Sequence, residues 1–244
     1  MRRSPALMAA ILILGWSGCI IINDDDAPFS DCLDGRGNIV STVYELSPFN
    51  EIELLGDVEL ILSQGPVPNV ELRAYENLLD EVLLDVNGDR LIISSRRCIN
   101  YQDRPKLLLT NPNFKKISNS GATNISGDNT LAISSLSIDI LGSGDISLAL
   151  QADNLDVLLT GSGDLELTGS ADVLKMSITG SGDFLGFGLT SRQAEILLTG
   201  SGDAEVFVED ALKATITGSG SVFFKGHPTL TTTLTGSGEV VDRN

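Results

Sequence analysis

The chain is 244 residues long, carries a formal net charge of −17 at pH 7 and contains only 5% aromatic residues. An acidic excess this large argues against nucleic acid and anionic membrane surfaces as partners, because both require a basic patch. The length suits one elongated all-β domain with a thin core of Leu, Ile and Val.

Residues 1–18 have the pattern of a signal peptide. Two arginines precede an apolar run, Leu7 to Leu14, that is too short to span a bilayer. Trp16-Ser17-Gly18 then leads into Cys19, and small residues before a cysteine resemble the bacterial lipoprotein processing box. Trp16 departs from the aliphatic residue that is usual there, so an ordinary secretory leader is the alternative. We expect the leader to be removed and Cys19 to carry the lipid.

Residues 19–28 form an acidic tether, with Asn23-Asp24-Asp25-Asp26 at its centre. An acidic run after a lipidated cysteine resembles the surface-export signal of some bacterial groups. Together the leader and tether predict a protein of the bacterial cell envelope. A lipid anchor would hold it to the outer membrane, facing the periplasm or the outside.

Residues 29–110 show an irregular β pattern. Phe49 to Leu54, a Gly56-Asp57 turn and Val58 to Leu62 predict strand, turn and strand. Further strands are expected at Val70 to Ala74, Val82 to Val86 and Leu91 to Ser94. We expect these coils to begin the sheets of the domain and to cap them.

Cys32 and Cys98 remain after Cys19 is assigned to the lipid. An even pair in an exported chain favours a disulfide, worth roughly 4 kcal/mol for a loop of this length. A metal or redox pair is the alternative, but no CxxC spacing is present. His227 is the only histidine, so it has no second histidine with which to build a metal site. No cofactor is expected.

Residues 111–244 contain a repeat. Gly-Ser-Gly recurs six times at intervals of 18 to 20 residues, after a degenerate copy at Asn119-Ser120-Gly121. The turn glycines are Gly142, Gly144, Gly161, Gly163, Gly180, Gly182, Gly200, Gly202, Gly218, Gly220, Gly236 and Gly238. Self-similarity at this period predicts a solenoid in which one supersecondary unit stacks on the next.

Alternate residues before each Gly-Ser-Gly are apolar. Examples are Leu136, Ile138 and Ile140 before the first copy, and Leu174, Met176 and Ile178 before the third. A second alternation follows each turn. Period two predicts strands with one buried face, whereas a helix would need apolar spacing near 3.6. Each repeat is therefore expected to be strand, tight turn, strand and a looser return.

Two physical constraints explain glycine at these turns. A sharp reversal needs backbone at positive φ, and stacked coils about 4.8 Å apart leave little room for side chains. The serine hydroxyl is expected to bond local backbone or the serine one coil away. A phosphate-binding loop is the alternative, but it needs a following helix and usually a lysine, and the repeat supplies neither.

An acidic column follows the turns, at Asp145, Asp164, Asp183 and Asp203. Stacking would place these carboxylates about 4.8 Å apart, where neighbours repel by roughly 1 kcal/mol in water. Calcium would relieve that repulsion. We favour the simpler interpretation, in which each carboxylate accepts a local turn N–H and faces solvent.

Outward positions show alternating charge at Asp156, Lys175, Glu195 and Lys213. This row predicts ion pairs between adjacent coils, acid facing base. A catalytic lysine–aspartate pair is the alternative, but it needs a pocket that a flat sheet does not provide.

The last coil reads Thr229-Leu230-Thr231-Thr232-Thr233-Leu234-Thr235, with Thr232 at a position that is apolar in most other coils. We interpret it as a polar cap on the solenoid. End-to-end assembly into a homo-oligomer is the alternative, because exposed sheet edges pair readily with other chains.

Several of these features resemble the bacterial DUF2807 family, also called the "putative auto-transporter adhesin, head GIN domain". They are Phe49 and Ile52, Gly56-Asp57-Val58, the Asn87-Gly88 turn before Leu91, and the serial Gly-Ser-Gly-Asp turns. The resemblance covers roughly residues 29–241. It implies a right-handed β-helix of 18–20-residue coils, shaped like pectin lyases but without their catalytic residues, and a role in adhesion.

These observations predict an exported, lipid-anchored, non-enzymatic β-helix that binds a protein or glycan ligand at the cell surface. A rigid rod without a catalytic group offers an extended surface for many weak polar contacts. A structural lipoprotein of the periplasm and a carbohydrate-active β-helix enzyme are the alternatives.

Overall fold

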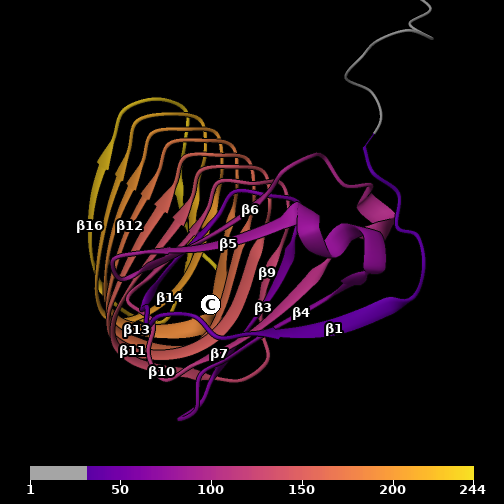
Figure 1. The fold of residues 1–244 in the computed structure, drawn as a ribbon. Coiled ribbons are helices and arrows are strands. Elements are labelled where there is room, and N and C mark those ends of the chain that lie inside the picture. The colour runs from indigo at the N-terminus through magenta and orange to yellow at the C-terminus, as the bar shows by residue number, and fades with distance from the viewer. Residues whose placement is uncertain (1–31) are drawn as a thin grey trace, which may run out of the picture. The chain divides into compact units, whose positions relative to one another are not determined.

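A computed structural model describes residues 32–244, which form one compact unit. The unit is a β-solenoid of about 7 turns with coils about 19 residues apart, as the sequence predicts (Figure 1). Two short 3-10 helices, η1 (Glu76–Glu81) and η2 (Tyr101–Asp103), lie in its N-terminal part. Within residues 32–244, no helix is long and apolar enough to cross a membrane. The leader and Cys19 lie outside the described residues.

Long parallel strands build the regular part of the solenoid. They are β10 (Leu131–Ile140), β11 (Ile146–Leu159), β12 (Leu165–Ile178), β13 (Phe184–Leu198) and β14 (Ala204–Ile216). Each pairs in parallel with the next, so equivalent residues of successive repeats stack. The expected looser return is wrong, because the chain stays extended from one Gly-Ser-Gly turn to the next. Register shifts interrupt the pairing only in the later coils, as between Glu166 and Thr168 of β12 and again between β13 and β14.

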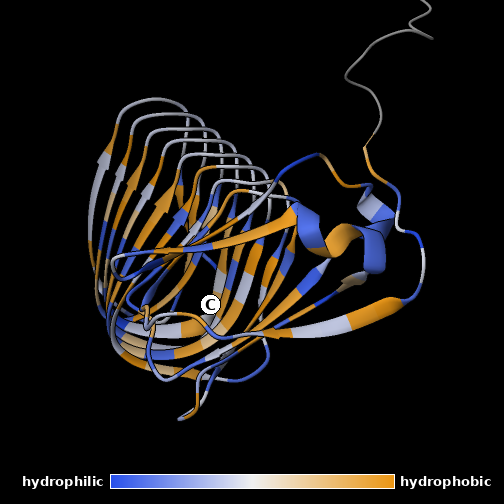
Figure 2. Ribbon diagram, in the orientation of Figure 1, coloured by the Kyte–Doolittle hydropathy of each residue, from blue (hydrophilic) through white to orange (hydrophobic). Residues whose placement is uncertain are grey.

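Aliphatic ladders fill the interior. The alternate residues expected to point inward are buried in β10 to β14, for example Leu136, Leu155, Leu174, Ala194 and Leu212. In parallel sheets side chains at one register position lie on the same face, so each ladder is continuous through the stack. Figure 2 shows the result as strands that alternate in hydropathy below nearly neutral stacked turns.

The N-terminal coils do not follow sequence order in space. Strand β2 (Glu51–Leu54) lies between β6 (Arg90–Ser95) and β8 (Lys116–Asn119). In the same way β3 (Glu59–Gln64) lies between β7 (Lys106–Asn111) and β9 (Ile125–Gly127). The coil formed by β2 and β3 is thus enclosed by two coils that come later in the chain.

Antiparallel strands close this end of the stack. Strand β5 (Val82–Asn87) pairs antiparallel with β6, while β4 (Asn69–Tyr75) pairs antiparallel with β7. Strand β1 (Ile39–Tyr44) then adds antiparallel to β4. We call these three strands, β1, β4 and β5, the antiparallel cap. The cap ends the parallel ladder, so no further coil can stack there in the same register.

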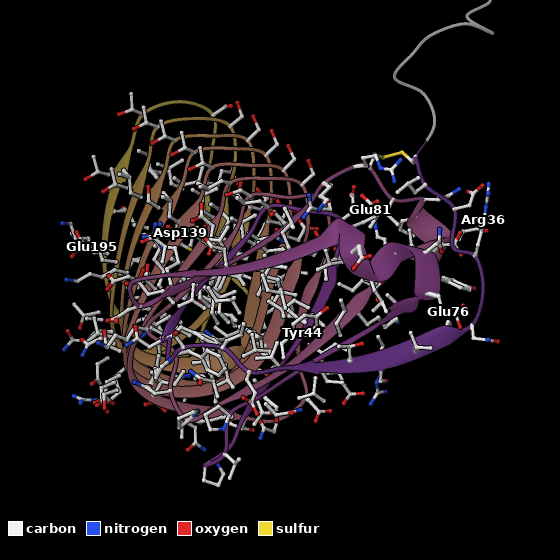
Figure 3. All side chains as sticks on the ribbon, in the orientation of Figure 1. Arg36, Tyr44, Glu76, Glu81, Asp139 and Glu195 are labelled. Carbon is white, nitrogen blue, oxygen red and sulfur yellow. A yellow bond between two sulfur atoms is a disulfide. The ribbon has the colours of Figure 1, made fainter. Side chains whose placement is uncertain are left out.

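The predicted disulfide between Cys32 and Cys98 is confirmed, with a Cα–Cα distance of 4.6 Å. Beside it Leu33 forms a parallel bridge with Ile99, and the Leu33 N–H donates to the Cys98 carbonyl at 2.8 Å. The disulfide therefore fastens the start of the described chain to the loop between β6 and β7. Its sulfur atoms are visible as the yellow bond in Figure 3.

At the other end the stack stops with three short strands. Strand β15 (Val222–Lys225) and β16 (Thr229–Leu234) pair with the two halves of β14, and β17 (Val240–Asp242) pairs with β15. Among the residues that the structure describes, no further strand pairs with β16 or β17. We call this surface the open end.

Candidate functional site

The described part of the chain, residues 32–244, contains no group of three or more His, Cys, Asp or Glu side chains placed to hold a metal ion. The regular coils also carry repeating surfaces. Three of them cross the stacked coils: the turn column, the aspartate column beside it, and the outer face of one sheet.

The turn column contains the twelve turn glycines. A Cβ atom built on any of them would overlap a backbone carbonyl oxygen of the preceding coil, as Gly180 would overlap Gly161. Close stacking is thus the constraint that requires glycine. The expected positive φ is wrong for eleven of the twelve, because only Gly236 has φ in the left-handed region, at 130°.

The serines of the turns are exposed in every coil. They are Ser143, Ser162, Ser181, Ser201, Ser219 and Ser237. Bonds across the coils come from the serine backbone rather than from the expected hydroxyl: the Ser162 N–H donates to the Gly142 carbonyl at 3.1 Å. The hydroxyl groups form a polar rim along one side of the solenoid.

The aspartate column is linked from coil to coil. One oxygen of Asp145 accepts from the backbone N–H of Asp164 at 2.9 Å, and Asp164 accepts from Asp183 at 2.8 Å. The series continues through Asp203 to the N–H of Ser221 at 2.7 Å. We expected each carboxylate to accept from an N–H of its own turn, but each accepts from an N–H of the next coil. This bonding gives each aspartate a structural role.

The outer face of the sheet formed by the C-terminal halves of β10 to β14 carries the predicted charged row. The register places Asp156 opposite Lys175, Lys175 opposite Glu195, and Glu195 opposite Lys213. Lys213 Nζ donates to Glu195 Oε1 at 2.7 Å, which lowers the pKa of the Glu195 carboxyl. Within residues 32–244, Lys175 forms no ion pair shorter than 4.0 Å. Lys175 therefore lies between Asp156 and Glu195 with its ammonium group available to a ligand.

Apolar and polar groups flank this row. Leu158 and Leu197 occupy the neighbouring row, where Leu197 is 45% exposed. In β10 the equivalent residue is Asp139, which accepts from Lys116 at 2.7 Å. Asp139 and Glu195 are both labelled in Figure 3, on the side of the molecule formed by the regular coils.

Two shallow hollows lie on this face. The first, of about 360 Å³, is lined by residues that include Asp156, Lys175, Glu195 and Leu197. The second, of about 280 Å³, shares Lys175 and Glu195 and extends to Thr231 of β16. We call the surface around both hollows the charged face. It offers charges of both signs, hydroxyl groups and aliphatic side chains.

The structure places the predicted site residues as follows. Cys32 and Cys98 form the disulfide, and the turn glycines form one column. Cys19 lies outside the described residues, so its lipidation remains a prediction. Sequence reasoning identified the charged row but missed the hollows, since their depth depends on side-chain packing across four coils.

Comparison with known families identifies the class of protein that this fold and surface define. The model of the DUF2807 family, "Putative auto-transporter adhesin, head GIN domain", matches residues 48–228. The chain belongs to this family. The chain has no significant match among curated proteins.

Solved structures share the fold. A protein from Bacteroides fragilis described as a putative adhesin is 22% identical with a TM-score of 0.80, covering 86% of this chain and all of its own. A Parabacteroides distasonis protein described as a putative lipid binding protein is 24% identical with a TM-score of 0.72, covering 88% and 100%. A further Parabacteroides distasonis protein, described as a putative adhesin, is 23% identical with a TM-score of 0.66, covering 87% and 100%. At these identities the likeness establishes the fold alone.

Proposed function

We propose that the chain is an exported lipoprotein, anchored through Cys19, whose solenoid binds a protein or glycan ligand in adhesion at the cell surface. The charged face is the observation that carries this proposal. It is broad, hollowed and charged in both signs, and its centre is Lys175, which has acids on both sides. Family membership supports the same function, because the family's description is that of an adhesin head.

Repeated weak contacts explain how such a surface binds. A ligand lying across the strands meets the same kinds of group at each coil, so contacts of modest strength add along the solenoid. Exposed ion pairs contribute little to stability, and their polar groups remain available to a ligand. We infer a non-enzymatic role, since the charged face is open and its acids and bases lie in a row rather than converge in a pocket.

A charge reversal at the centre of the face tests binding. Full-length protein is applied to an immobilised panel of polysaccharides and extracellular proteins, and Lys175→Glu is compared with Arg36→Glu. Both variants change the net charge equally, but Arg36 lies at the antiparallel cap (Figure 3). We expect Lys175→Glu to lower retention at least tenfold and Arg36→Glu to leave it unchanged. Equal behaviour of the two variants would exclude the charged face as the binding surface.

Localisation separates the proposal from a structural periplasmic lipoprotein. Intact cells are treated with protease, and the domain is followed by immunoblot. Surface presentation predicts cleavage without breaking the outer membrane. Protection until the membrane is broken would support the periplasmic alternative.

The enzymatic alternative has its own readout. The protein is incubated with the same polysaccharides, and reducing ends are measured over time. Binding without release of reducing ends is expected, whereas catalytic release would overturn the non-enzymatic assignment.

A further inference from the structure

The open end exposes an unusual edge strand. All six residues of β16 are exposed, and its backbone pairs with β14 on one side only among the described residues. Proteins commonly protect such edges with charged side chains, proline, a bulge or a covering element. Thr229–Leu234 contains no charged residue and no proline, and within residues 32–244 no element covers its free edge.

Two leucines at this edge belong to the core ladders. Leu230 stacks on Leu212, and Leu234 stacks on Ile216. Leu212 and Ile216 are each 1% exposed, whereas Leu230 is 43% and Leu234 is 50% exposed. Thr232 occupies the inward position between them, as expected. The predicted polar cap at the open end is nevertheless incomplete, because Leu230 and Leu234 remain exposed. The hydrophobic interior therefore continues to the open end.

The sequence around β16 is palindromic. Thr229 to Thr235 reads Thr-Leu-Thr-Thr-Thr-Leu-Thr in both directions. If two copies pair antiparallel about Thr232, Leu230 lies opposite the partner subunit's Leu234, and inward residues meet inward residues. A shift of one residue would place leucine opposite threonine and inward faces opposite outward ones. Only the register centred on Thr232 places both leucines opposite leucine.

We propose that the open end binds a second copy of this chain, with β16 of each copy paired antiparallel about a two-fold axis at Thr232. Charge favours a second copy as the occupant. The chain has a net charge of −17, yet Thr229 to Gly238 contains no charged residue, so the two acidic molecules meet along an uncharged strand and turn. A two-fold contact closes on itself, so it gives a dimer and not a filament.

This arrangement has a consequence for adhesion, which rests on the lipid anchoring in the proposed function. A two-fold axis across the open ends makes the two solenoids run in opposite directions. Cys32, the first described residue, lies at the capped end of each copy, so the two capped ends face away from each other. Copies anchored on facing membranes are oriented to join the two surfaces.

Mass measurement on matched variants tests the pairing. The full chain in mild detergent is examined by sedimentation equilibrium up to about 100 μM, a range that captures micromolar affinities. We expect twice the 25.8 kDa of one chain. Thr232→Lys places two ammonium groups together at the axis and should give a monomer. Thr233→Lys, on the outward side of the same strand, faces the partner subunit's Thr231 and should remain dimeric.

Folding is checked independently by circular dichroism, since Thr232 and Thr233 are both exposed in the single chain. A monomeric wild-type chain, or a dimer that survives Thr232→Lys, overturns the proposal. Oxidative crosslinking tests the register. Thr232→Cys should form a covalent dimer because each copy meets itself there, and Thr231→Cys should stay at the background set by the unsubstituted chain. Crosslinking through Thr231→Cys alone overturns the register.

Phosphatidylcholine vesicles carrying the processed chain, lipidated at Cys19, test the facing arrangement. Vesicles that carry the wild-type chain or Thr233→Lys should aggregate, while vesicles that carry Thr232→Lys should remain dispersed. A soluble dimer that leaves vesicles dispersed overturns the facing arrangement. Failure of the chain to float with the vesicles instead overturns lipid anchoring, so the two failures are distinguishable.

Discussion

The capped and open ends of this solenoid contrast in how a parallel stack is terminated. At the capped end, β4 and β5 reverse direction and turn the ladder antiparallel, and the Cys32–Cys98 disulfide fastens the adjoining loop. At the open end the repeat simply stops with β16, still carrying leucines at inward positions. Repetition extends a solenoid but cannot end it, because each coil recreates the edge that the next coil needs.

Side-chain chemistry differs along the same axis. The capped end uses pairs specific to their positions, such as Arg90 with Glu51 and Glu53 at 3.2 Å and Arg97 with Glu81 at 2.6 Å. The regular coils also hold single pairs, such as Lys213 with Glu195, but they add a bond that repeats from coil to coil in the aspartate column. Specific pairs fix an irregular arrangement, whereas repeated bonds fix only the spacing between neighbours. The following changes test that contrast, beginning with the largest expected effect.

A methyl group in the turn column should be the most damaging change. Gly180→Ala places its Cβ against the Gly161 carbonyl, which is itself held in the stack. Overpacking usually costs about 1–3 kcal/mol, and this overlap should exceed that range and the cost of losing the disulfide, because the backbone cannot move aside without unstacking the coils. Ser181→Ala, at an exposed position in the same turn, is the control and should change stability by less than about 0.5 kcal/mol. Chemical denaturation of both variants measures the difference.

Loss of the disulfide should affect the capped end specifically. The double variant Cys32→Ser, Cys98→Ser removes the disulfide beside the Leu33–Ile99 bridge. We expect this change to lower the free energy of unfolding by about 2–4 kcal/mol. Hydrogen exchange should rise in residues 32–38 and 96–104, with little change in β11 to β13. Uniformly faster exchange through the regular coils would show that the two regions are not independent.

The contrast also separates what the sequence predicts from what it does not. Regular strands follow directly from alternation before each Gly-Ser-Gly, because stacking places identical positions together. The enclosure of β2 between β6 and β8 has no such signal, since spatial neighbours there are distant in sequence and share no repeat. Two reasons favour glycine at the twelve turn positions. Close stacking of the coils is confirmed at all twelve, whereas a positive φ is found only at Gly236.

Surface features divide in the same way. The charged row is visible in sequence because its residues share one register position. The sequence does not show which N–H each aspartate binds, since a carboxylate can reach an N–H in its own turn or in the next coil. Only the placement of Asp164 against the Asp183 N–H decides between them.

The aspartate column gives the next prediction. Asp164→Ala removes the acceptor for the Asp183 N–H and should cost about 1 kcal/mol. Asp164→Asn keeps an acceptor oxygen and removes a charge from an acidic column, so it should be at least as stable as the wild type. Thermal unfolding with and without millimolar calcium provides the measurement. A wild-type-specific rise in melting temperature with calcium, absent from Asp164→Asn, would favour the cation site over the structural role.

The smallest expected effect concerns pH at the capped end. Arg97 donates to both carboxylate oxygens of Glu81, whose side chain is only 12% exposed, and this bonding holds the pKa of Glu81 below its usual value of 4.5. A depressed acid pKa stabilises the fold at pH values above 4.5, and that stability is lost as pH falls through the folded-state pKa.

Glu81→Gln should therefore be less stable than the wild type at pH 7, and the difference should shrink steadily below pH 4.5. Denaturant unfolding between pH 7 and pH 3 measures it. Glu209→Gln, at an exposed position of the regular coils, is the matched control and should follow the wild-type profile. A stability difference for Glu81→Gln that stays constant to pH 3 would mean that its ion pair with Arg97 does not fix the capped end, and that packing around η1 does so instead.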